Sequence, residues 1–476
     1  MDITNQQELE ARVDAYIDEV WPEVIADIER LVKHPSVADE TKAEPGAPFG
    51  PEVRGALDEA LGIAERLGYT TGDDEGYLGW GDIAGETETQ LATICHVDVV
   101  PAGPGWTGDP FTVRQREGYL LGRGVSDDKG PAVLSLYAGA FLLHEGITPR
   151  YSFRALLGCD EEVGMTDVHH YLETHENPAF LFTPDAEFPV CNAEKGLFGA
   201  TFASGAIEDG RIISWSGAEA TNAIPSESII ELAVDAAELP APKANADRLT
   251  IEEVRSGVTR ITAYGIGGHA AMPEGSLNAI GLIVTYLREL TGVLAPEEER
   301  FVELLAIVHA DTAGEAMGIA SADEAFGPLT ANAGVIEVAD GHITQTLDCR
   351  CPASITAEEM ERTLTELATR YGATLTVDST KPPFSVDAAH PAVQTLINVY
   401  REVSGNHEAA PFSMGGGTYA RNFACAVSFG PEEPAAATLS WVGPMHGPDE
   451  GASEEALKRA LKIYILAILK LQEVEL

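Results

Sequence analysis

Short apolar segments typical of buried β-strands alternate with helical segments over the first 195 residues, and this alternation restricts the fold more than any other feature of the chain. Helices are expected over 6–33, 53–67 and 131–146, and strands over 91–100, 151–159 and 179–185. Parallel strands need helical crossovers, which cover the sheet on both sides. The first 195 residues therefore predict an α/β domain with a mixed, largely parallel sheet and helices on both faces.

The middle of the chain has a different texture, with shorter strands separated by turn signals. One long helix is expected near 277–291, a hairpin is expected around Asp340-Gly341, and Thr356 with Glu359 forms a capping box. The α/β pattern returns after residue 384. The sequence therefore predicts one α/β domain, formed by 1–195 and 385–476, that is interrupted by an α+β domain at 196–384.

Charge and composition exclude several classes of partner. The chain of 476 residues carries a formal net charge of −46, which argues against binding to nucleic acid or to an anionic membrane surface. The amino terminus lacks the pattern of a secretory signal, and no apolar run approaches membrane-spanning length. We therefore expect a soluble, cytoplasmic protein. Its six cysteines are scattered, so reduced thiols are expected, including Cys349 and Cys351.

Residues suited to metal binding follow the expected strands, where open α/β sheets place ligand sites. His96 is followed two residues later by Asp98, whose carboxylate could fix the second imidazole nitrogen. A lone histidine at a strand end is nevertheless more often structural. Asp127 and Asp128 stand in the Gly-rich turn GRGVSDDKGP. One of them could cap the next helix, but two acids exceed what a cap requires.

Further acids and a second histidine complete this pattern. Glu161 and Glu162 follow a strand in GCDEEVG, Asp185 ends another strand, and His446 precedes the last expected helix. Each acid alone could belong to a solvated turn in so acidic a chain. Adjacent carboxylates can also divide their roles, with one binding metal and its neighbour acting as general base. Two histidines and three carboxylates would serve two zinc-like ions if one carboxylate bridges them.

Six motifs occur in an order and at separations that resemble a known metallopeptidase family. They are HVDVVP, GRGVSDDKGP, CDEEVG, TPDAEFP, GGHAAMPEGSLNA and MHGPDE. Over nearly its whole length the chain resembles the family that includes aminoacylase, carboxypeptidase G and the bacterial dipeptidases of the PepV type. The segments TPDAEFP and GGGTYAR, together with the long insertion, are most similar to the PepV branch. The resemblance implies that the α/β domain is catalytic and that the insertion is a lid.

The resemblance also implies a pair of divalent metal ions. His96 and Asp185 would bind one ion and Glu162 and His446 the other, with Asp127 bridging them beside a cis peptide bond to the next residue. Zinc is the expected metal, and manganese or cobalt would suit the same ligands.

Catalytic roles are implied for four further residues. Asp98 would orient His96, and Glu161 would activate a metal-bridging water and then protonate the leaving amine. His269, in the insertion, would stabilise the oxyanion. Asn222 stands where related enzymes place a second such group, although the local sequence departs from the commoner pattern.

Recognition of the substrate's terminal carboxylate is implied for a second set of residues. Arg350 lies on an expected strand, facing away from the neighbouring cysteines, and its guanidinium fork suits a carboxylate. A surface salt bridge is the alternative interpretation. The loop GGGTYAR, with Gly416 and Thr418, precedes an expected helical turn whose backbone N–H groups could bind the same carboxylate, although it could equally be a plain turn.

These features predict a metal-dependent dipeptidase that acts on small peptides with a free C-terminal carboxylate. An N-acyl amino acid deacylase of the same family would use the same metals and carboxylate clamp, so it stays an alternative. A non-catalytic peptide-binding protein is the third hypothesis, but such a protein would be expected to have lost the base or a ligand. The insertion is long enough for two small α+β units, one of which could replace a partner's lid, so we also expect an active monomer.

Overall fold

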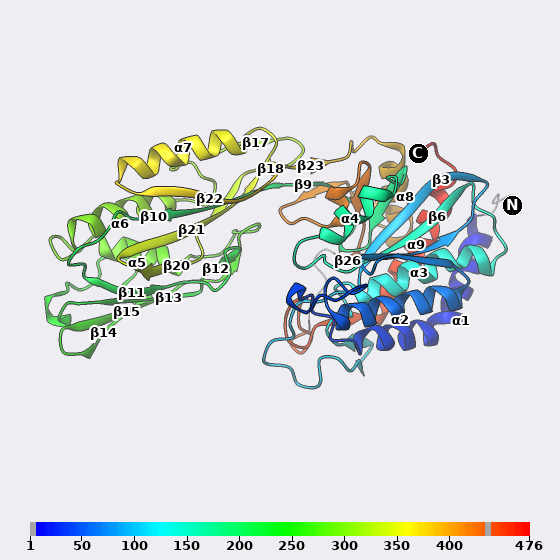
Figure 1. The fold of residues 1–476 in the computed structure, drawn as a ribbon, viewed down its shortest axis with the longest axis horizontal. Helices are drawn as coiled ribbons and strands as arrows, with labels where there is room; N and C mark the ends of the chain where they lie inside the picture. The colour runs from blue at the N-terminus through cyan, green and yellow to red at the C-terminus, as the bar shows by residue number, and fades with distance from the viewer. Residues whose placement is uncertain (1–5, 434–438) are drawn as a thin grey trace. The chain divides into compact units, whose positions relative to one another are not determined.

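The computed structural model of the chain describes residues 6–433 and 439–476, and these divide into two compact units (Figure 1). Unit 1 comprises Met1–Asn192, Ser385–Phe412 and Gly417–Leu476, and unit 2 comprises Ala193–Phe384 and Ser413–Gly416. The sequence placed the insertion at 196–384. The structure differs in starting unit 2 at Ala193 and in giving it the short segment Ser413–Gly416 as well. In this segment the carbonyl oxygens of Met414 and Gly415 accept hydrogen bonds from Lys195 and Arg350 of unit 2.

Unit 1 is built on a mixed sheet with the strand order β1-β2-β6-β3-β7-β25-β9-β23, in which the last strand is β23 (Phe384–Ser385). The central strands are parallel: β6 (Tyr151–Gly158), β3 (Thr87–His96), β7 (Phe180–Thr183) and β25 (Ala426–Ser428). Antiparallel strands flank them: β1 (Thr70–Asp74), β2 (Leu78–Ile83) and β9 (Cys191–Glu194). The prediction of a mixed, largely parallel sheet is confirmed.

Helices cover both faces of this sheet. They are α1 (Gln6–Val32), α2 (Pro51–Leu67), α3 (Lys129–His144), α4 (Thr166–Thr174), α8 (Pro391–Ser404) and α9 (Glu454–Leu471). A Cβ atom at Gly79 of β2 would lie 2.8 Å from Leu57 of α2, whereas the ring of the next residue, Trp80, packs 6.1 Å from that of Tyr171 in α4. Successive strand residues point to opposite faces, so α2 and α4 lie on opposite sides.

Helix α3 sets the position of the acidic turn that precedes it. The helix is buried on all sides because α1, α2, α9 and the sheet surround it, which explains its lack of a polar face. A Cβ atom at Gly130 would lie 2.1 Å from the carbonyl oxygen of Val125, so only glycine lets the turn close against the helix. Asp127 and Asp128 therefore directly precede the helix in a tightly fixed turn.

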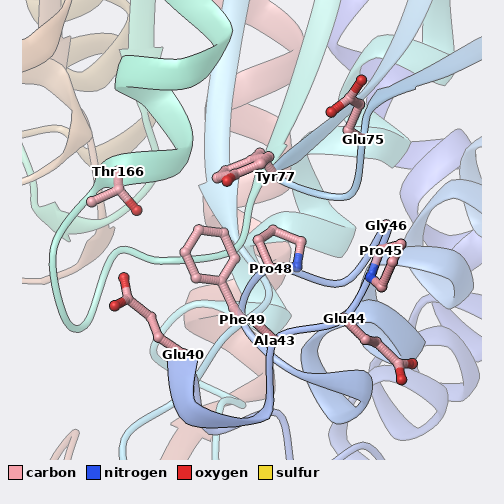
Figure 2. A pocket seen from close by; sticks show the side chains of 10 residues that line it. All are labelled: Glu40, Ala43, Glu44, Pro45, Gly46, Pro48, Phe49, Glu75, Tyr77 and Thr166. Atoms are coloured by element: carbon pink, nitrogen blue, oxygen red, sulfur yellow. The ribbon is translucent and has the colours of Figure 1, made fainter.

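The segment between α1 and α2 borders an open cavity of about 730 Å³ in unit 1 (Figure 2). The rings of Phe49 and Tyr77 meet there edge to face, with centroids 5.5 Å apart. Thr166 also lines the cavity and donates from its backbone N–H to Asp160 Oδ2 at 2.9 Å. The cavity therefore adjoins the acidic turn that follows β6.

Unit 2 contains two main sheets and three helices. One sheet has β19 (Thr330–Asn332), β21 (His342–Cys351), β10 (Gly196–Ala203) and β22 (Thr374–Lys381), with β20 (Ile336–Ala339) beside β21. The other has β11 (Ile212–Ser216), β13 (Glu227–Leu232), β15 (Val258–Tyr264) and β14 (Leu249–Arg255). The helices are α5 (Ala279–Leu287), α6 (Pro296–Val308) and α7 (Ala357–Arg370). A single hydrophobic core joins both sheets, so the insertion is one α+β unit and not the two small units expected.

Several local predictions can be compared with unit 2. Asp340 and Gly341 both have positive φ and join β20 to β21, and Thr356 and Glu359 form the capping box of α7, so both predictions are confirmed. The long helix expected near 277–291 was wrong in its extent, since α5 ends at Leu287. Within the described ranges, no helix is long and apolar enough to cross a membrane.

Candidate metal centre

The candidate ligands of unit 1 meet because three neighbouring parallel strands end side by side. His96 ends β3, the acidic turn with Glu161 and Glu162 follows β6, and Asp185 follows β7. Ligand atoms of His96, Glu161 and Asp185 all lie within 4.8 Å of one another. A second such group consists of His96, Asp127 and Glu162. The fold thus gathers the predicted ligands at one edge of the sheet.

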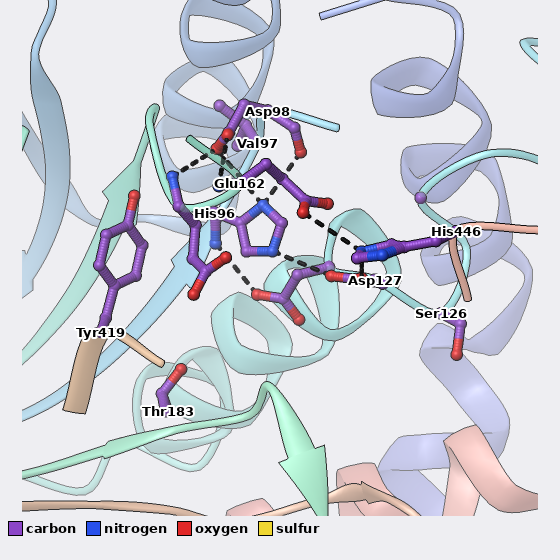
Figure 3. Close-up of polar contacts among 12 residues, drawn as sticks. His96, Val97, Asp98, Ser126, Asp127, Glu162, Thr183, Tyr419 and His446 are labelled. Atoms are coloured by element: carbon purple, nitrogen blue, oxygen red, sulfur yellow. Dashed lines mark hydrogen bonds and ion pairs between the residues drawn. The ribbon is translucent and has the colours of Figure 1, made fainter. Parts of the chain in front are cut away.

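Asp127 lies between two histidines that come from distant parts of the chain (Figure 3). Its Oδ1 is 3.0 Å from His96 Nε2, and its Oδ2 is 2.8 Å from His446 Nε2. His446 Nε2 is also 3.2 Å from Glu162 Oε2. The peptide bond between Asp127 and Asp128 is cis, as the resemblance implied. Each oxygen of Asp127 therefore faces a different histidine.

Asp98 connects His96 to the acidic turn. His96 Nδ1 lies 3.0 Å from the carbonyl oxygen of Asp98 and 3.3 Å from its Oδ1. The same carboxylate accepts hydrogen bonds from the backbone N–H groups of Glu161 at 3.3 Å and Glu162 at 3.1 Å. Nδ1 faces Asp98 and Nε2 faces Asp127, so the ring would keep its proton on Nδ1 and offer Nε2 to a metal that binds between His96 and Asp127.

Burial and mutual repulsion make this cluster electrostatically unfavourable by itself. Burial raises the pKa of Glu161 well above its ordinary value, and the charge of Asp185 raises it further. Burial also raises the pKa of Asp185, with a further contribution from Asp127. Hydrogen bonds with Asp127 and Glu162 raise the pKa of His446 to about 10. The cluster holds more negative charge than its imidazoles can neutralise.

The donor set fits divalent cations. Carboxylate oxygens and imidazole nitrogens are the ligands that zinc-like ions take in proteins, and buried carboxylates are rarely left without a cation. Glu162 Oε1 is buried and accepts no hydrogen bond from the part of the chain that the structure describes. An oxygen in this position is suited to a metal ion.

Sequence reasoning missed Glu450, which supports Asp127 from behind. Its Oε1 accepts hydrogen bonds from the backbone N–H groups of Gly124 and Ser126, both at 3.0 Å, and of Asp127 at 3.2 Å. Its other oxygen pairs with Arg123, and both side chains are almost fully buried. The motif MHGPDE ends in this glutamate, so the signal was present in the sequence, but only its histidine was assigned a role.

A second support also escaped the sequence analysis. Asp167 Oδ2 accepts hydrogen bonds from the Tyr419 hydroxyl at 2.5 Å and from the backbone N–H groups of Cys159 at 2.6 Å and Asp160 at 3.2 Å. Burial raises the pKa of Asp167 to about 7. These contacts fix the start of the acidic turn from the side of α4.

In unit 2, His269 belongs to a short two-stranded ribbon formed by β12 (Ala223–Ile224) and β16 (Gly268–His269), and Asn222 directly precedes β12. The backbone N–H of Ala271 donates to His269 Nδ1 at 3.2 Å, so the neutral ring carries its proton on Nε2. Asn222 Nδ2 lies 3.4 Å from that nitrogen. The two side chains therefore lie within hydrogen-bonding distance of each other.

Arg350 lies on β21 and is oriented by a partner that the sequence analysis did not name. Its Nε and Nη2 donate to the two oxygens of Asp348 at 2.8 and 3.1 Å, and its Nη1 donates to the carbonyl oxygen of Gly415 at 2.9 Å. Asp348 stands two residues earlier on the same strand face. Of the five N–H donors of the guanidinium, three are engaged by the described residues, which leaves two for a carboxylate ligand.

The Gly-rich loop is divided between the two units. Gly416 belongs to unit 2, and a Cβ atom there would meet nothing within 4 Å. Thr418 belongs to unit 1, where its hydroxyl caps the 3₁₀ turn Tyr419–Asn422 by accepting from the Ala420 N–H at 3.1 Å. The predicted helical turn is present. One of its backbone N–H groups, that of Ala420, is already hydrogen-bonded to the Thr418 hydroxyl.

The chain matches the family described as Peptidase family M20/M25/M40 over residues 92–470. It is 33% identical over 464 residues to the Bacillus subtilis protein named "Putative dipeptidase YtjP". The alignment covers 94% of this chain and 97% of that protein. A Staphylococcus haemolyticus protein, "Putative dipeptidase SH1171", is 30% identical over 469 residues, with 96% and 98% covered.

Solved structures share the fold at low sequence identity. The dipeptidase Dug1p from Saccharomyces cerevisiae superposes with a TM-score of 0.59 at 10% identity, over 98% of this chain and 99% of that chain. Human carnosine dipeptidase 1 gives a TM-score of 0.56 at 13% identity, over 98% and 100%. The arrangement of an α/β unit interrupted by an α+β unit is therefore shared with both structures.

Proposed function

This chain belongs to the peptidase family M20/M25/M40 and is a hydrolytic peptidase, and from that premise we propose that it hydrolyses dipeptides with a free C-terminal carboxylate. The observation that carries the proposal is the contact of the two Asp127 oxygens with two different histidines, His96 and His446. A carboxylate placed in this way suits a bridge between paired metal ions. Two relatives that bear the name dipeptidase match along nearly their full length, which supports short peptides as substrates.

Two divalent ions would be held in unit 1, one by His96 and Asp185 and the other by Glu162 and His446, with Asp127 shared between them. When bound, the ions supply Lewis acidity that polarises the scissile carbonyl and lowers the pKa of water. Zinc is the metal that we propose, and manganese and cobalt suit the same ligands.

Glu161 is the proton carrier in this proposal. Its carboxylate lies within 4.8 Å of ligand atoms of His96 and Asp185, and burial raises its pKa, which makes it a stronger base than an exposed glutamate. It accepts a proton from the attacking water and donates it to the leaving nitrogen as the C–N bond breaks. The oxygen of the water thus becomes part of the new carboxylate, and its proton becomes part of the new amine.

Unit 2 is assigned the recognition of charge on the substrate. His269 Nε2–H and the Asn222 amide would donate to the oxygen that becomes negative in the transition state. Arg350, held by Asp348, would bind the terminal carboxylate with its two remaining N–H donors. A requirement for that carboxylate favours dipeptides over longer, internally cleaved peptides.

A substrate panel tests the proposal. Dipeptides, tripeptides and N-acyl amino acids would be assayed after chelation and after refilling with zinc, manganese or cobalt. We expect dipeptides to be hydrolysed fastest, with activity lost on chelation and restored by metal. Faster turnover of N-acyl amino acids would instead identify a deacylase, and metal-independent hydrolysis would contradict the proposed centre.

Amidated substrates test the role of Arg350 separately. Amidation removes the carboxylate charge, so it should strongly reduce kcat/KM in the wild type. In Arg350→Lys the carboxylate has already lost its bidentate partner, so amidation should reduce kcat/KM little further. Equal penalties in both proteins would remove Arg350 from the carboxylate site.

A further inference from the structure

Two asparagines hold the segment that carries Asn222, and we propose that Asn332 and Asn278 are positioning residues for Asn222 and His269. The inference rests on the proposed function, since it concerns the residues assigned there to stabilising the oxyanion. Both asparagines belong to unit 2, as do the residues that they hold.

Asn332 contacts the backbone on both sides of Asn222. It is the last residue of β19, and 5% of its surface is exposed. Its Nδ2 donates to the carbonyl oxygen of Ala223 at 2.9 Å and approaches that of Thr221 at 3.4 Å. A Cβ atom at Gly334 would lie 2.4 Å from the same Ala223 oxygen, so the chain after β19 presses closely on this segment. Asn332 therefore fixes the peptide units that flank Asn222.

Asn278 fixes the amide of Asn332 in the required orientation. It caps α5, with its Oδ1 accepting from the Ile280 N–H at 2.9 Å. Its Nδ2 therefore faces the other way, where it donates to the Ala333 carbonyl oxygen at 2.8 Å and to Asn332 Oδ1 at 3.2 Å. Because Asn332 accepts through Oδ1, its NH₂ group must point to the Asn222 segment. The start of α5 is thereby connected to that segment by two amides.

The β12–β16 ribbon connects the segment around Asn222 to His269 through backbone hydrogen bonds. Ala223 pairs with His269 across β12 and β16, and the Ala270 N–H donates to the carbonyl oxygen of Asn222 at 2.8 Å. The Ala271 N–H then sets the ring tautomer through Nδ1. A shift of the segment around Asn222 would therefore displace both proposed oxyanion donors together.

Asparagine is needed at both positions because each amide both donates and accepts. Asn332→Asp keeps the shape of the side chain but replaces the donor by an oxygen that repels the Ala223 carbonyl. Asn278→Asp keeps a good N-cap for α5 and replaces the donation to Asn332 and Ala333 by an oxygen that repels the oxygens of both. Both residues line a cavity of about 470 Å³, so a changed side chain can be solvated there and the variants should fold.

The matched control is Thr285→Val. Thr285 lines the same cavity, but its hydroxyl bonds to the Gly281 carbonyl oxygen within α5, away from the two asparagines. We expect Asn332→Asp to lower kcat on dipeptides by about 10-fold and Asn278→Asp by about 3-fold, with KM changed less than about 2-fold. Thr285→Val should leave both constants unchanged, and all three variants should bind metal as the wild type does.

A double-mutant cycle separates positioning from general destabilisation. If Asn332 acts through Asn222 and His269 together, then Asn332→Asp should reduce kcat by clearly less than about 10-fold when introduced into His269→Ala, because the contribution of His269 is already lost there. Amide hydrogen exchange gives a readout that needs no substrate: Asn332→Asp should accelerate exchange at Ala270 by about 10-fold.

An equal loss of kcat in both backgrounds, or unchanged exchange at Ala270, would overturn the proposal. If the wild type hydrolysed no dipeptide, the proposed function would fail by itself. The exchange measurement would still decide whether Asn332 holds the ribbon.

Discussion

Three consecutive acids follow β6, and each has a different environment. Asp160 Oδ2 accepts hydrogen bonds from the backbone and the hydroxyl of Thr166, so this residue shapes the turn. Glu161 lies near ligand atoms of His96 and Asp185, and Glu162 contacts His446. The backbone of both glutamates is held by Asp98. In the proposed function, neighbouring acidic residues therefore acquire separate tasks from the direction in which the turn points each side chain.

Glu161→Gln tests this division of tasks. The amide cannot accept a proton, so we expect kcat to fall by about 10³-fold or more while the protein still binds two metal ions. Metal content would be measured by atomic emission after removal of loosely bound ions. The matched control, Glu162→Gln, should instead lose one ion. Loss of an ion from Glu161→Gln would identify Glu161 as a ligand.

Glu450 gives a second prediction at this scale. Glu450→Gln leaves Arg123 charged and buried without its partner, which should lower the free energy of unfolding by about 3 kcal/mol. The turn before Asp127 would also loosen, so metal affinity should fall by about 10-fold or more. Urea unfolding and metal competition titrations would measure both effects.

The neighbouring Asp449 provides the control for that experiment. Asp449 pairs with Arg114 and accepts from the Thr107 N–H in a more exposed position. Asp449→Asn should therefore lower the free energy of unfolding by less than about 1 kcal/mol. Equal effects of the two substitutions would show that the burial of Glu450 is unimportant.

The predictability of a residue depended on whether its partners are close in sequence. His96, the acidic turn and Asp185 could be located because each directly follows an apolar strand. Glu450 supports an amide 323 positions away, and Asn332 supports a carbonyl 109 positions away, so neither contact leaves a local pattern. Asp348 is an intermediate case: it shares a strand face with Arg350, but a carboxylate in so acidic a chain is a weak signal.

At the scale of helices and strands, elements with a specific capping or turn sequence were predicted correctly, and some of the elements without one were not. The capping box of α7 and the turn between β20 and β21 were found because few residues suit those positions. Helix α6 was missed although Pro296 stands in its first turn, followed by three glutamates. Its interior mixes charged and apolar residues, so the periodic signal is weaker than in α5, which is mostly apolar.

His309, which caps the C-terminus of α6, gives a prediction of pH dependence. Burial lowers its pKa to about 4, although a hydrogen bond between Nε2 and Gln345 Oε1 acts in the opposite direction. The unfolded chain takes up a proton near pH 6.5 and the folded protein near pH 4, so the unfolded state binds more protons in between. Stability should therefore fall by about 2–3 kcal/mol as pH decreases from 6.5 to 4.

His309→Gln should remove this contribution. The difference in unfolding free energy between wild type and variant, measured by urea titration at each pH, isolates it from the titration of the acidic cluster. His407→Gln, which changes an exposed histidine, is the control substitution. A variant profile parallel to that of the wild type between pH 4 and 6.5 would contradict the assignment.

At the scale of the whole molecule, charge opposes self-association. The formal net charge of −46 produces repulsion between copies, which salt screens over about 8 Å at physiological ionic strength. Strand β14 forms an edge of its sheet in unit 2 and carries Glu252 and Glu253 in the order EEVR. Charged side chains on an edge strand disfavour pairing with another sheet. Both features argue for a monomer.

We therefore predict that a single chain is fully active. Light scattering coupled to size-exclusion chromatography, at dilutions where turnover is still measured, should give a mass near 50.6 kDa. Mixing inactive Glu161→Gln chains with His269→Ala chains, which keep only a low residual activity, provides a complementary test, because unit 1 of one variant and unit 2 of the other are intact. If each chain uses only its own residues, the activity of the mixture stays at that residual level at all salt concentrations. Recovery of activity on mixing, or an active species of twice the chain mass, would show that chains share sites and that the acidic edge of unit 2 does not prevent pairing.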